Sequence, residues 1–429
     1  MEFHRGQLEA LNDLVNALRI SKGTLVTLAS IETIDKFEEQ VLKAPTWKSL
    51  IGKIEFGMLA WRTIYRVAKS IPEAYEGMLS DFNSGSVRDE LIGALREQFE
   101  SLPGEYDIFI PMGAVQELHC GEITITESVA IADTLHNDDL RDLISHGVET
   151  NALYRALAGW PQLPKSIDSI RYLRISGSGY GDDSPQSPVV RHAWSIAKQL
   201  VFVGMASGAL IPNASEFLFS SGISPINNIP TLVVSRSSSG EVFRTSPGFE
   251  LGQLLHTIKF KNFRFYDLAT GATLLSSEER DATTGDEIRQ AVNRSMATAA
   301  TFLKIESPDA APIRAAMEWF VDADASQNET VAFLQRCIGL EALLGSSESK
   351  RDVTERLADR YSYIVANTAS SRDIHRAKFI AMYKHRSEIV HGRSTKLSDE
   401  HRRASWEARE MLLQAAWREM HNVLKETRT

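Results

Sequence analysis

The spacing of apolar positions changes along the chain. Between residues 7 and 99, apolar side chains recur every three to four positions, which is the period of a helix that buries one face. The clearest examples are Leu8, Leu11, Val15 and Leu18, followed by a long amphipathic stretch over residues 47–69. The pattern therefore predicts a helical N-terminal region, residues 1–104.

Strand-like segments begin after the break at Leu102-Pro-Gly-Glu. Short runs rich in β-forming residues occupy 106–110, 122–126, 170–175, 231–234 and 241–244. Helical patterns lie at 189–208 and 287–304, and a polar loop near 270–286 precedes the second of them. We predict that residues 105–308 form a mixed α/β region with a sensing or regulatory role.

Every segment beyond Ser307-Pro-Asp-Ala-Ala-Pro is helical in pattern. Helices are expected at 313–321, at 329–344 with Gly345 closing it, at 353–366, at 371–391 with Ser371 as cap and Gly392 as stop, and at 398–424. The last helix presents an apolar face of Trp406, Leu413, Trp417, Met420 and Leu424. Residues 309–429 are therefore predicted to form an all-α bundle large enough to fold alone, which makes the chain an α+β multidomain protein.

Composition agrees with a globular protein of two or three domains, since the chain has 429 residues and 43% are apolar. Cys120 and Cys337 are far apart, and the N-terminus has no secretion signal, so we expect a cytoplasmic protein without disulfides or a membrane segment. The net charge is −9, but residues 372–403 contain 9 basic and 4 acidic side chains. This basic segment is either a solvated helix face or a surface for a polyanion.

A glycine run, Ser-Gly-Ser-Gly-Tyr-Gly, follows the strand predicted to end at Ile175. It lacks the lysine of a phosphate-binding P-loop, and Asp182 and Asp183 would repel an anion. We interpret it as a flexible connection.

The basic segment contains Arg386-Ser-Glu-Ile-Val-His391. A guanidinium fits a phosphate and an imidazole exchanges protons near neutral pH, so together they can cleave a phosphodiester without a metal. On one helix the two residues would lie about 7.5 Å apart along the axis and about 140° apart around it, so one helix cannot bring both groups fully together. The same interval from Arg141 to His146 follows a strand-rich segment and is interpreted as coincidence.

Three motifs of the predicted bundle occur in a specific order. They are Cys337-Ile-Gly-Leu-Glu341-Ala-Leu-Leu-Gly345, Glu355-Arg356-Leu-Ala-Asp-Arg360 and Tyr383-Lys-His-Arg386-Ser-Glu-Ile-Val-His391-Gly392. Together they resemble the Apea-like HEPN domain family over about the last 120 residues. The resemblance implies a metal-independent RNA endonuclease that acts as a homodimer, with Arg386 on the scissile phosphate and His391 exchanging a proton.

We expect auxiliary roles for several residues near this pair. Ser387 stands where the family has a polar residue after the arginine, and Tyr383 either orients Arg386, stacks on a base or is a core residue. Glu341 needs a partner, which is Arg356 or Arg360, or else it tunes Arg386 or His391. Residues suited to phosphate contacts, or otherwise solvated, are Lys384, His385 and Arg393.

The eleven histidines show no metal-ligand spacing, so neither a metal nor another cofactor is expected. The family resemblance implies an effector in antiviral defence or toxin-like growth arrest, with a phage-derived or small-molecule trigger at the N-terminal region. The alternative is a non-catalytic RNA- or protein-binding dimerisation module with a ligand-sensing N-terminal region.

Overall fold

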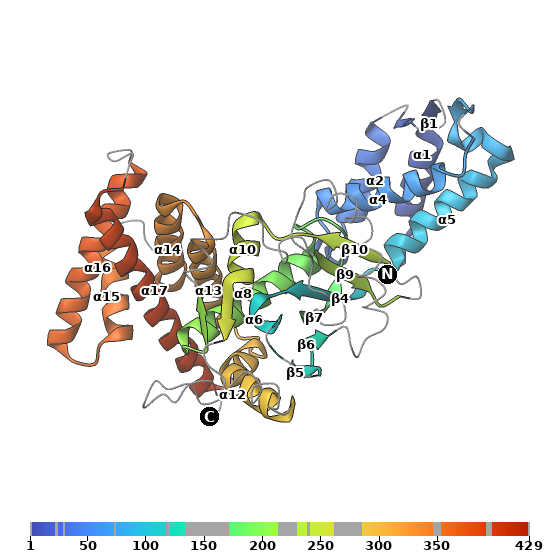
Figure 1. Cartoon of the computed structure of the whole chain (residues 1–429). Helices are drawn as coiled ribbons and strands as arrows, with labels where there is room; N and C mark the ends of the chain where they lie inside the picture. Colours follow the sequence, from blue (N-terminus) through green and yellow to red (C-terminus); the bar gives the residue numbers. More distant parts are fainter. Residues whose placement is uncertain are drawn as a thin grey trace, which may run out of the picture. The chain divides into compact units, whose positions relative to one another are not determined.

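The protein is a mixed α/β chain with sheets in its middle and a helical C-terminal region (Figure 1). The computed structural model describes residues 2–21, 25–28, 31–72, 74–116, 118, 121–133, 171–212, 230–237, 241–260, 285–345, 353–391 and 397–427. Several predicted features lie outside these residues: Cys120, Arg141, His146, Gly392, Arg393 and the loop at 270–284. Within the described part of the chain, no helix combines the length and apolar character needed to cross a bilayer.

The middle strands form a six-stranded sheet in the order β10-β9-β4-β7-β6-β5. The strands are β4 (Gly104–Pro111), β5 (Ile123–Thr126), β6 (Val129–Asp133), β7 (Arg171–Gly179), β9 (Thr231–Ser235) and β10 (Val242–Thr245). β6 pairs antiparallel with both β5 and β7, so that Ile131 lies opposite Ile123 on one side and Leu173 on the other. The strand predictions at 106–110, 122–126, 231–234 and 241–244 agree with this sheet.

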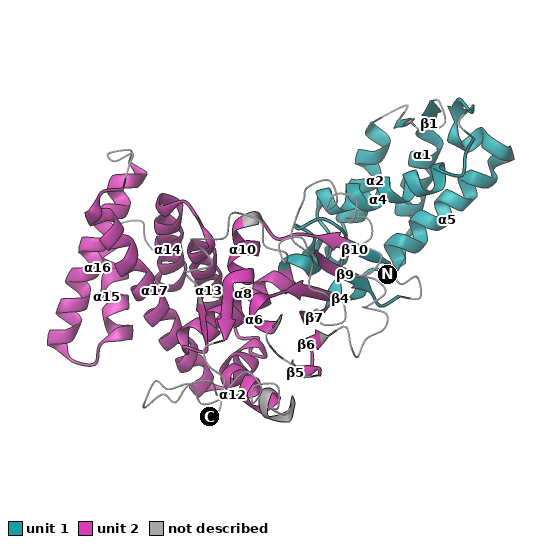
Figure 2. Cartoon of the chain, viewed as in Figure 1, with its two compact units in different colours: residues 1–107, 177–191, 233–243 teal, residues 108–176, 192–232, 244–429 magenta. Residues whose placement is uncertain are grey.

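The chain divides into two compact units, and the boundaries between them fall within β4, β7, β9, β10 and the helix α8 (Pro188–Ala206) (Figure 2). Unit 1 combines residues 1–107, 177–191 and 233–243, and unit 2 combines residues 108–176, 192–232 and 244–429. The three consecutive regions expected from the sequence stay a prediction, with residues 309–429 lying entirely in unit 2.

Unit 1 is mainly helical and packs around an aromatic cluster. Its helices are α1 (Arg5–Ala17), α2 (Glu32–Leu42), α3 (Pro45–Lys48), α4 (Lys53–Ala68), the 3₁₀ segment η1 (Leu79–Gly85) and α5 (Ser86–Glu100). Phe37, Phe56 and Phe99 are fully buried, with ring centroids 5.2 to 5.7 Å apart. Edge-on and tilted aromatic pairs of this kind stabilise a core beyond the area that they bury.

The N-terminal region also contains a small sheet that the helical pattern did not predict. Its order is β2-β1-β3, from β1 (Leu18–Ser21), β2 (Leu25–Leu28) and β3 (Gly77–Met78). Leu18 continues the helical spacing in sequence, but its backbone is extended, with φ −75° and ψ 126°. Its side chain is still fully buried. A buried apolar residue at this position is therefore compatible with the last turn of a helix and equally with the first residue of a strand.

The first four residues of the glycine run after Ile175 belong to a strand, so the strand is longer than predicted. β7 continues to Gly179, and the residues after it form a hydrogen-bonded turn. Buried Asp182 accepts a hydrogen bond from Tyr180 Oη at 2.7 Å and another from the Ser184 N–H at 2.8 Å. Asp182 therefore organises the turn that leads into α8 (Pro188–Ala206).

Unit 2 contains several elements besides the large sheet. They are α6 (Gly113–Gln116), β8 (Leu210–Pro212), α10 (Phe249–Thr257), β11 (Ile258–Phe260) and α12 (Gly285–Leu303), and β8 pairs antiparallel with β11. α8 and α12 confirm the predicted helices at 189–208 and 287–304. The pattern did not predict β6, β8 or β11, because segments of three to five residues show too few repeats to reveal a period.

The C-terminal helical region contains five helices within its described residues, 310–345, 353–391 and 397–427. They are α13 (Ala310–Ala325), α14 (Glu329–Leu344), α15 (Val353–Val365), α16 (Ala369–Val390) and α17 (Asp399–Glu426). The predicted bounds of α14 are confirmed. On α14, Gly339 has no room for a side chain, since a Cβ there would lie 2.8 Å from Leu412 of α17 and 3.1 Å from Trp319 of α13. This glycine lets three helices approach closely.

Two sequence predictions in this region are wrong. The cap of α16 is Thr368, whose Oγ1 accepts the Ser371 N–H at 3.3 Å, so Ser371 lies inside the helix. Trp406 is 57% exposed and does not belong to the buried face of α17. That face consists mainly of small and flexible residues, Ala404, Ala408, Met411, Leu412, Ala415, Ala416, Met420 and Val423. Alanines carry little weight in an apolar pattern, although they allow close helix packing.

A buried carboxylate joins α13, α14 and α17. Asp324 is 7% exposed and accepts hydrogen bonds from Arg336 of α14 at 3.0 Å and from Arg409 of α17 at 2.7 to 3.0 Å. Arg336 also donates to Ser405 Oγ at 2.7 Å, and the Arg409 guanidinium lies 4.9 Å from the centre of the Phe320 ring. Removing the carboxylate would leave Arg336 without its anionic partner and Arg409 with only Glu410, which lies 3.1 Å away.

We therefore expect Asp324→Asn to destabilise the protein by about 3 kcal/mol, because breaking a buried ion pair by removing one partner leaves an uncompensated charge. Urea unfolding followed by circular dichroism measures this change. The control is Asp359→Asn, which removes a half-exposed carboxylate paired with Arg376 and should shift the midpoint little. Equal small shifts in both variants would contradict a structural role for Asp324.

Candidate functional site

The last turns of α16 carry nearly all of the site residues predicted from sequence (Figure 1). This helix is anchored by Phe379 and Tyr383, which stack on each other with centroids 5.9 Å apart, and Phe379 also packs on Tyr361 of α15. Because these anchors lie on the inner side of α16, the residues that follow turn toward α14, toward α17 or toward solvent.

The side of α16 that faces α14 holds Arg386. Its Nη2 lies 3.1 Å from Glu341 Oε1, and its guanidinium carbon lies 5.4 Å from the centre of the Tyr383 ring. Tyr383 Oη donates a hydrogen bond to the same Glu341 oxygen at 2.8 Å. Glu341 therefore binds both Arg386 and Tyr383. The sequence left two possibilities for Glu341: a pair with Arg356 or Arg360 of α15, or a contact with Arg386 or His391. In the structure its charged partner is Arg386.

The Glu341–Arg386–Tyr383 cluster is partly buried. The Arg386 side chain keeps 26% of its surface exposed, whereas Tyr383 is only 8% exposed. Burial raises the pKa of Tyr383, and the hydrogen bond to Glu341 raises it further, so the phenol stays protonated and keeps donating to Glu341. A buried Tyr383 fits a residue that orients its neighbours better than one that stacks on a base.

Cys337 lies one turn before Glu341 on α14 and is fully buried. Burial raises the pKa of its thiol, and the nearby Glu341 carboxylate adds to the increase. A protonated, inaccessible thiol is neither a nucleophile nor a metal ligand. Cys337 is therefore a small core residue of the helical region.

His391 is the C-terminal cap of α16. Its backbone leaves the helical range, with φ −86° and ψ 11°, and its N–H donates to the Ser387 carbonyl at 3.1 Å. The side chain is exposed. In the described part of the chain, no hydrogen bond or ion pair joins His391 to Arg386, so a single protomer holds the two groups on one helix end without bringing them into contact.

The remaining candidates divide between two faces of α16. Lys384 is exposed, Ser387 is half-buried, and His385 turns toward α17. The Nδ1 atom of His385 lies 3.1 Å from Glu388 Oε2, and its ring lies 5.0 Å from the ring of His401. Sequence reasoning missed Glu388 and His401 as neighbours of His385, although His385 and Glu388 have the i, i+3 spacing of residues on one helix face.

Comparison of the chain with models of known protein families, with curated proteins and with solved structures finds no match.

Proposed function

We propose that this chain is a metal-independent RNA endonuclease of the HEPN type, acting as a homodimer through its C-terminal helical region. The supporting observation is the end of α16, where a partly exposed Arg386, held by Glu341, precedes an exposed His391 by five residues. A preorganised cation and an accessible imidazole are the two groups that metal-free phosphodiester cleavage uses.

In the proposed reaction, the 2′-hydroxyl of the RNA attacks the adjacent phosphorus and the bond to the 5′-oxygen breaks. Arg386 binds the phosphate and stabilises the negative charge that develops on it, while His391 exchanges a proton with the attacking or the leaving oxygen. The products are a 2′,3′-cyclic phosphate and a 5′-hydroxyl. Because the chain transfers only protons, this route consumes no cofactor.

A second protomer is proposed to complete the site, since one helix separates the two groups around its axis. Exposed apolar side chains support this proposal. Ile338 lies one turn before Glu341 on α14, and Val390 lies one turn after Arg386 on α16, and both are exposed. Residues at i+3 and i+4 share a helix face, so these apolar groups flank the charged cluster. A twofold contact there would bury them.

RNA binding is proposed to use the cations around the helix end. Lys384 is exposed beside Arg386, and the segment 372–403 is basic in an otherwise acidic chain. Such cations bind the sugar-phosphate backbone without reading sequence. We further propose a sensing role for residues 1–308 and a defence or growth-arrest role for the whole protein, both from the family resemblance.

A second candidate function is a non-catalytic RNA- or protein-binding module. The observation that favours it is the ion pair itself, because Glu341 offsets part of the Arg386 charge that a scissile phosphate would need. The two candidates differ in one readout, which is whether bound RNA is cut.

We expect purified protein to cleave RNA in the presence of EDTA, and Arg386→Ala or His391→Ala to lower the rate by about 100-fold or more, the usual loss when a charge-stabilising or proton-transferring group is removed. Cleavage is followed on a labelled single-stranded oligonucleotide. Matched controls are Arg418→Ala and His421→Ala, which remove the same residue types from α17, outside the basic segment 372–403, and should leave the rate unchanged.

Wild-type rates in both site variants, with the helical signal intact, would reject the assigned site. Stable RNA binding by the wild type without any product would instead favour the binding module.

Glu341→Ala should lower kcat by up to about 100-fold with a smaller change in KM, because a misplaced guanidinium costs more in the transition state than in substrate binding. Tyr383→Phe removes only the hydrogen bond to Glu341 and should keep kcat within a few fold of wild type. Steady-state kinetics separate the two parameters. An unchanged kcat in the Glu341 variant would show that Arg386 needs no positioning.

A further inference from the structure

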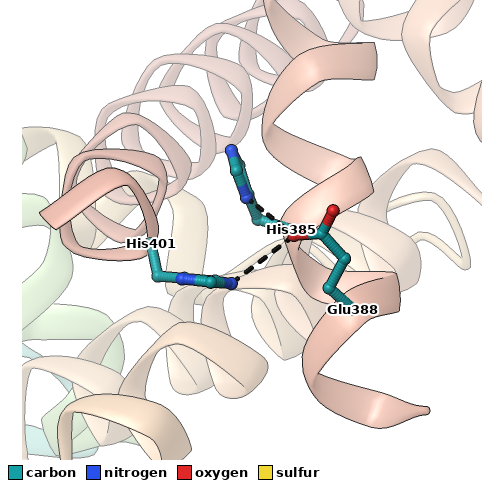
Figure 3. A group of neighbouring side chains, drawn as sticks. All are labelled: His385, Glu388 and His401. Atoms are coloured by element: carbon teal, nitrogen blue, oxygen red, sulfur yellow. Dashed lines mark hydrogen bonds and ion pairs between the residues drawn. The ribbon is translucent and has the colours of Figure 1, made fainter. Parts of the chain in front are cut away.

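Three potential metal ligands meet between the last turns of α16 and the first turn of α17 (Figure 3). The Glu388 carboxylate lies between two imidazoles, with its Oε2 atom 3.1 Å from His385 Nδ1 and 3.5 Å from His401 Nε2. The ligand atoms of the three residues all lie within 4.8 Å of one another. Two nitrogen donors and one oxygen donor thus converge from two helices.

His401 supplies an independent observation. The residue is 8% exposed, and its Nε2 atom is inaccessible to solvent and makes no hydrogen bond in the structure. At 3.5 Å, the Glu388 oxygen is too far for a good hydrogen bond from this nitrogen. A buried ring nitrogen without a partner is costly, so its orientation toward Glu388 calls for an explanation.

Ser398 fixes the His401 ring from the opposite side. Ser398 is the N-cap of α17, and its Oγ lies 2.7 Å from His401 Nδ1. With the proton on Nδ1, the ring donates to Ser398 Oγ and presents the Nε2 lone pair toward Glu388. In the other tautomer Nδ1 accepts the Ser398 N–H at 3.3 Å. A cation bound to Nε2 would select the tautomer with the proton on Nδ1. In that tautomer Nδ1 donates to Ser398 Oγ, and metal-binding histidines typically have such an acceptor for their other ring nitrogen.

We propose that His385, Glu388 and His401 bind a divalent transition-metal cation, with Zn²⁺ the best match. Imidazole nitrogens with a carboxylate are the donors that zinc accepts, at bonds of about 2.0 to 2.2 Å. In a tetrahedral site such bonds separate neighbouring ligand atoms by about 3.3 Å. The two distances to Glu388, 3.1 and 3.5 Å, already lie near this value, and the third pair lies within 4.8 Å.

The bound cation would fasten the end of α16 to the start of α17, one turn before His391. Three protein ligands leave at least one coordination position for water or another ligand. The proposed site is separate from Arg386, which faces α14, and it does not depend on the proposed RNA cleavage. Metal binding and strand cleavage can therefore succeed or fail independently.

The test uses the full chain, stripped with a chelator and dialysed, and titrates it with Zn²⁺ by calorimetry in parallel with thermal unfolding. We expect one Zn²⁺ per chain and a rise in Tm, since a ligand that binds the folded state stabilises it. His385→Ala and Glu388→Gln should weaken binding by more than about 100-fold, and Ser398→Ala by about 10- to 100-fold as an outer hydrogen-bond partner. Bound Co²⁺ should give a visible absorption spectrum that the two ligand variants lose.

The matched control is His421→Gln, which removes another imidazole from α17, where it contacts Trp417, and should bind Zn²⁺ like wild type. Circular dichroism checks that each variant keeps its helices. Absence of Zn²⁺ binding in the wild type would overturn the proposal. Equal binding in wild type and both ligand variants would overturn it as well, because the metal would then sit elsewhere.

Discussion

The C-terminal helical region depends on carboxylates that are paired across helix interfaces. Asp324 of α13 binds arginines from α14 and α17, and Glu341 of α14 binds an arginine and a tyrosine from α16. A buried or half-buried carboxylate is tolerated only when charged or hydrogen-bonding partners surround it. These pairs therefore fix which helices lie side by side, and they set the orientation of the groups at the end of α16.

The last turns of α16 thus present side chains to three different surroundings. Around the last turns of α16, Arg386 faces α14, His385 and Glu388 face α17, and Lys384 faces solvent. The α-helical period alone produces this division, since residues one or two positions apart point in different directions, whereas residues three apart, such as His385 and Glu388, share a face. The proposed RNA site and the proposed metal site can occupy the same turns because their side chains leave the helix on different sides.

Local features of this region could be predicted from the sequence, whereas partners across helix interfaces could not. The bounds of α14 follow from its apolar period and from Gly345, which closes it. The choice of Arg386 as partner of Glu341 depends on which helices pack together, and no spacing along one helix encodes that. His401 shows the same limit, because its neighbours His385 and Glu388 lie on α16. Leu18 shows that an apolar period cannot reveal where a helix gives way to a strand.

The central claim is that Arg386 and His391 cleave RNA by attack of its own 2′-hydroxyl, without a metal. Mass spectrometry of the fragment ends, after incubation of the protein with RNA in EDTA, tests this chemistry most directly. We expect 2′,3′-cyclic phosphates paired with 5′-hydroxyls, and no cut at a position that carries a 2′-deoxy sugar. Fragments ending in 3′-hydroxyl and 5′-phosphate groups, or equal cleavage at the deoxy position, would contradict it.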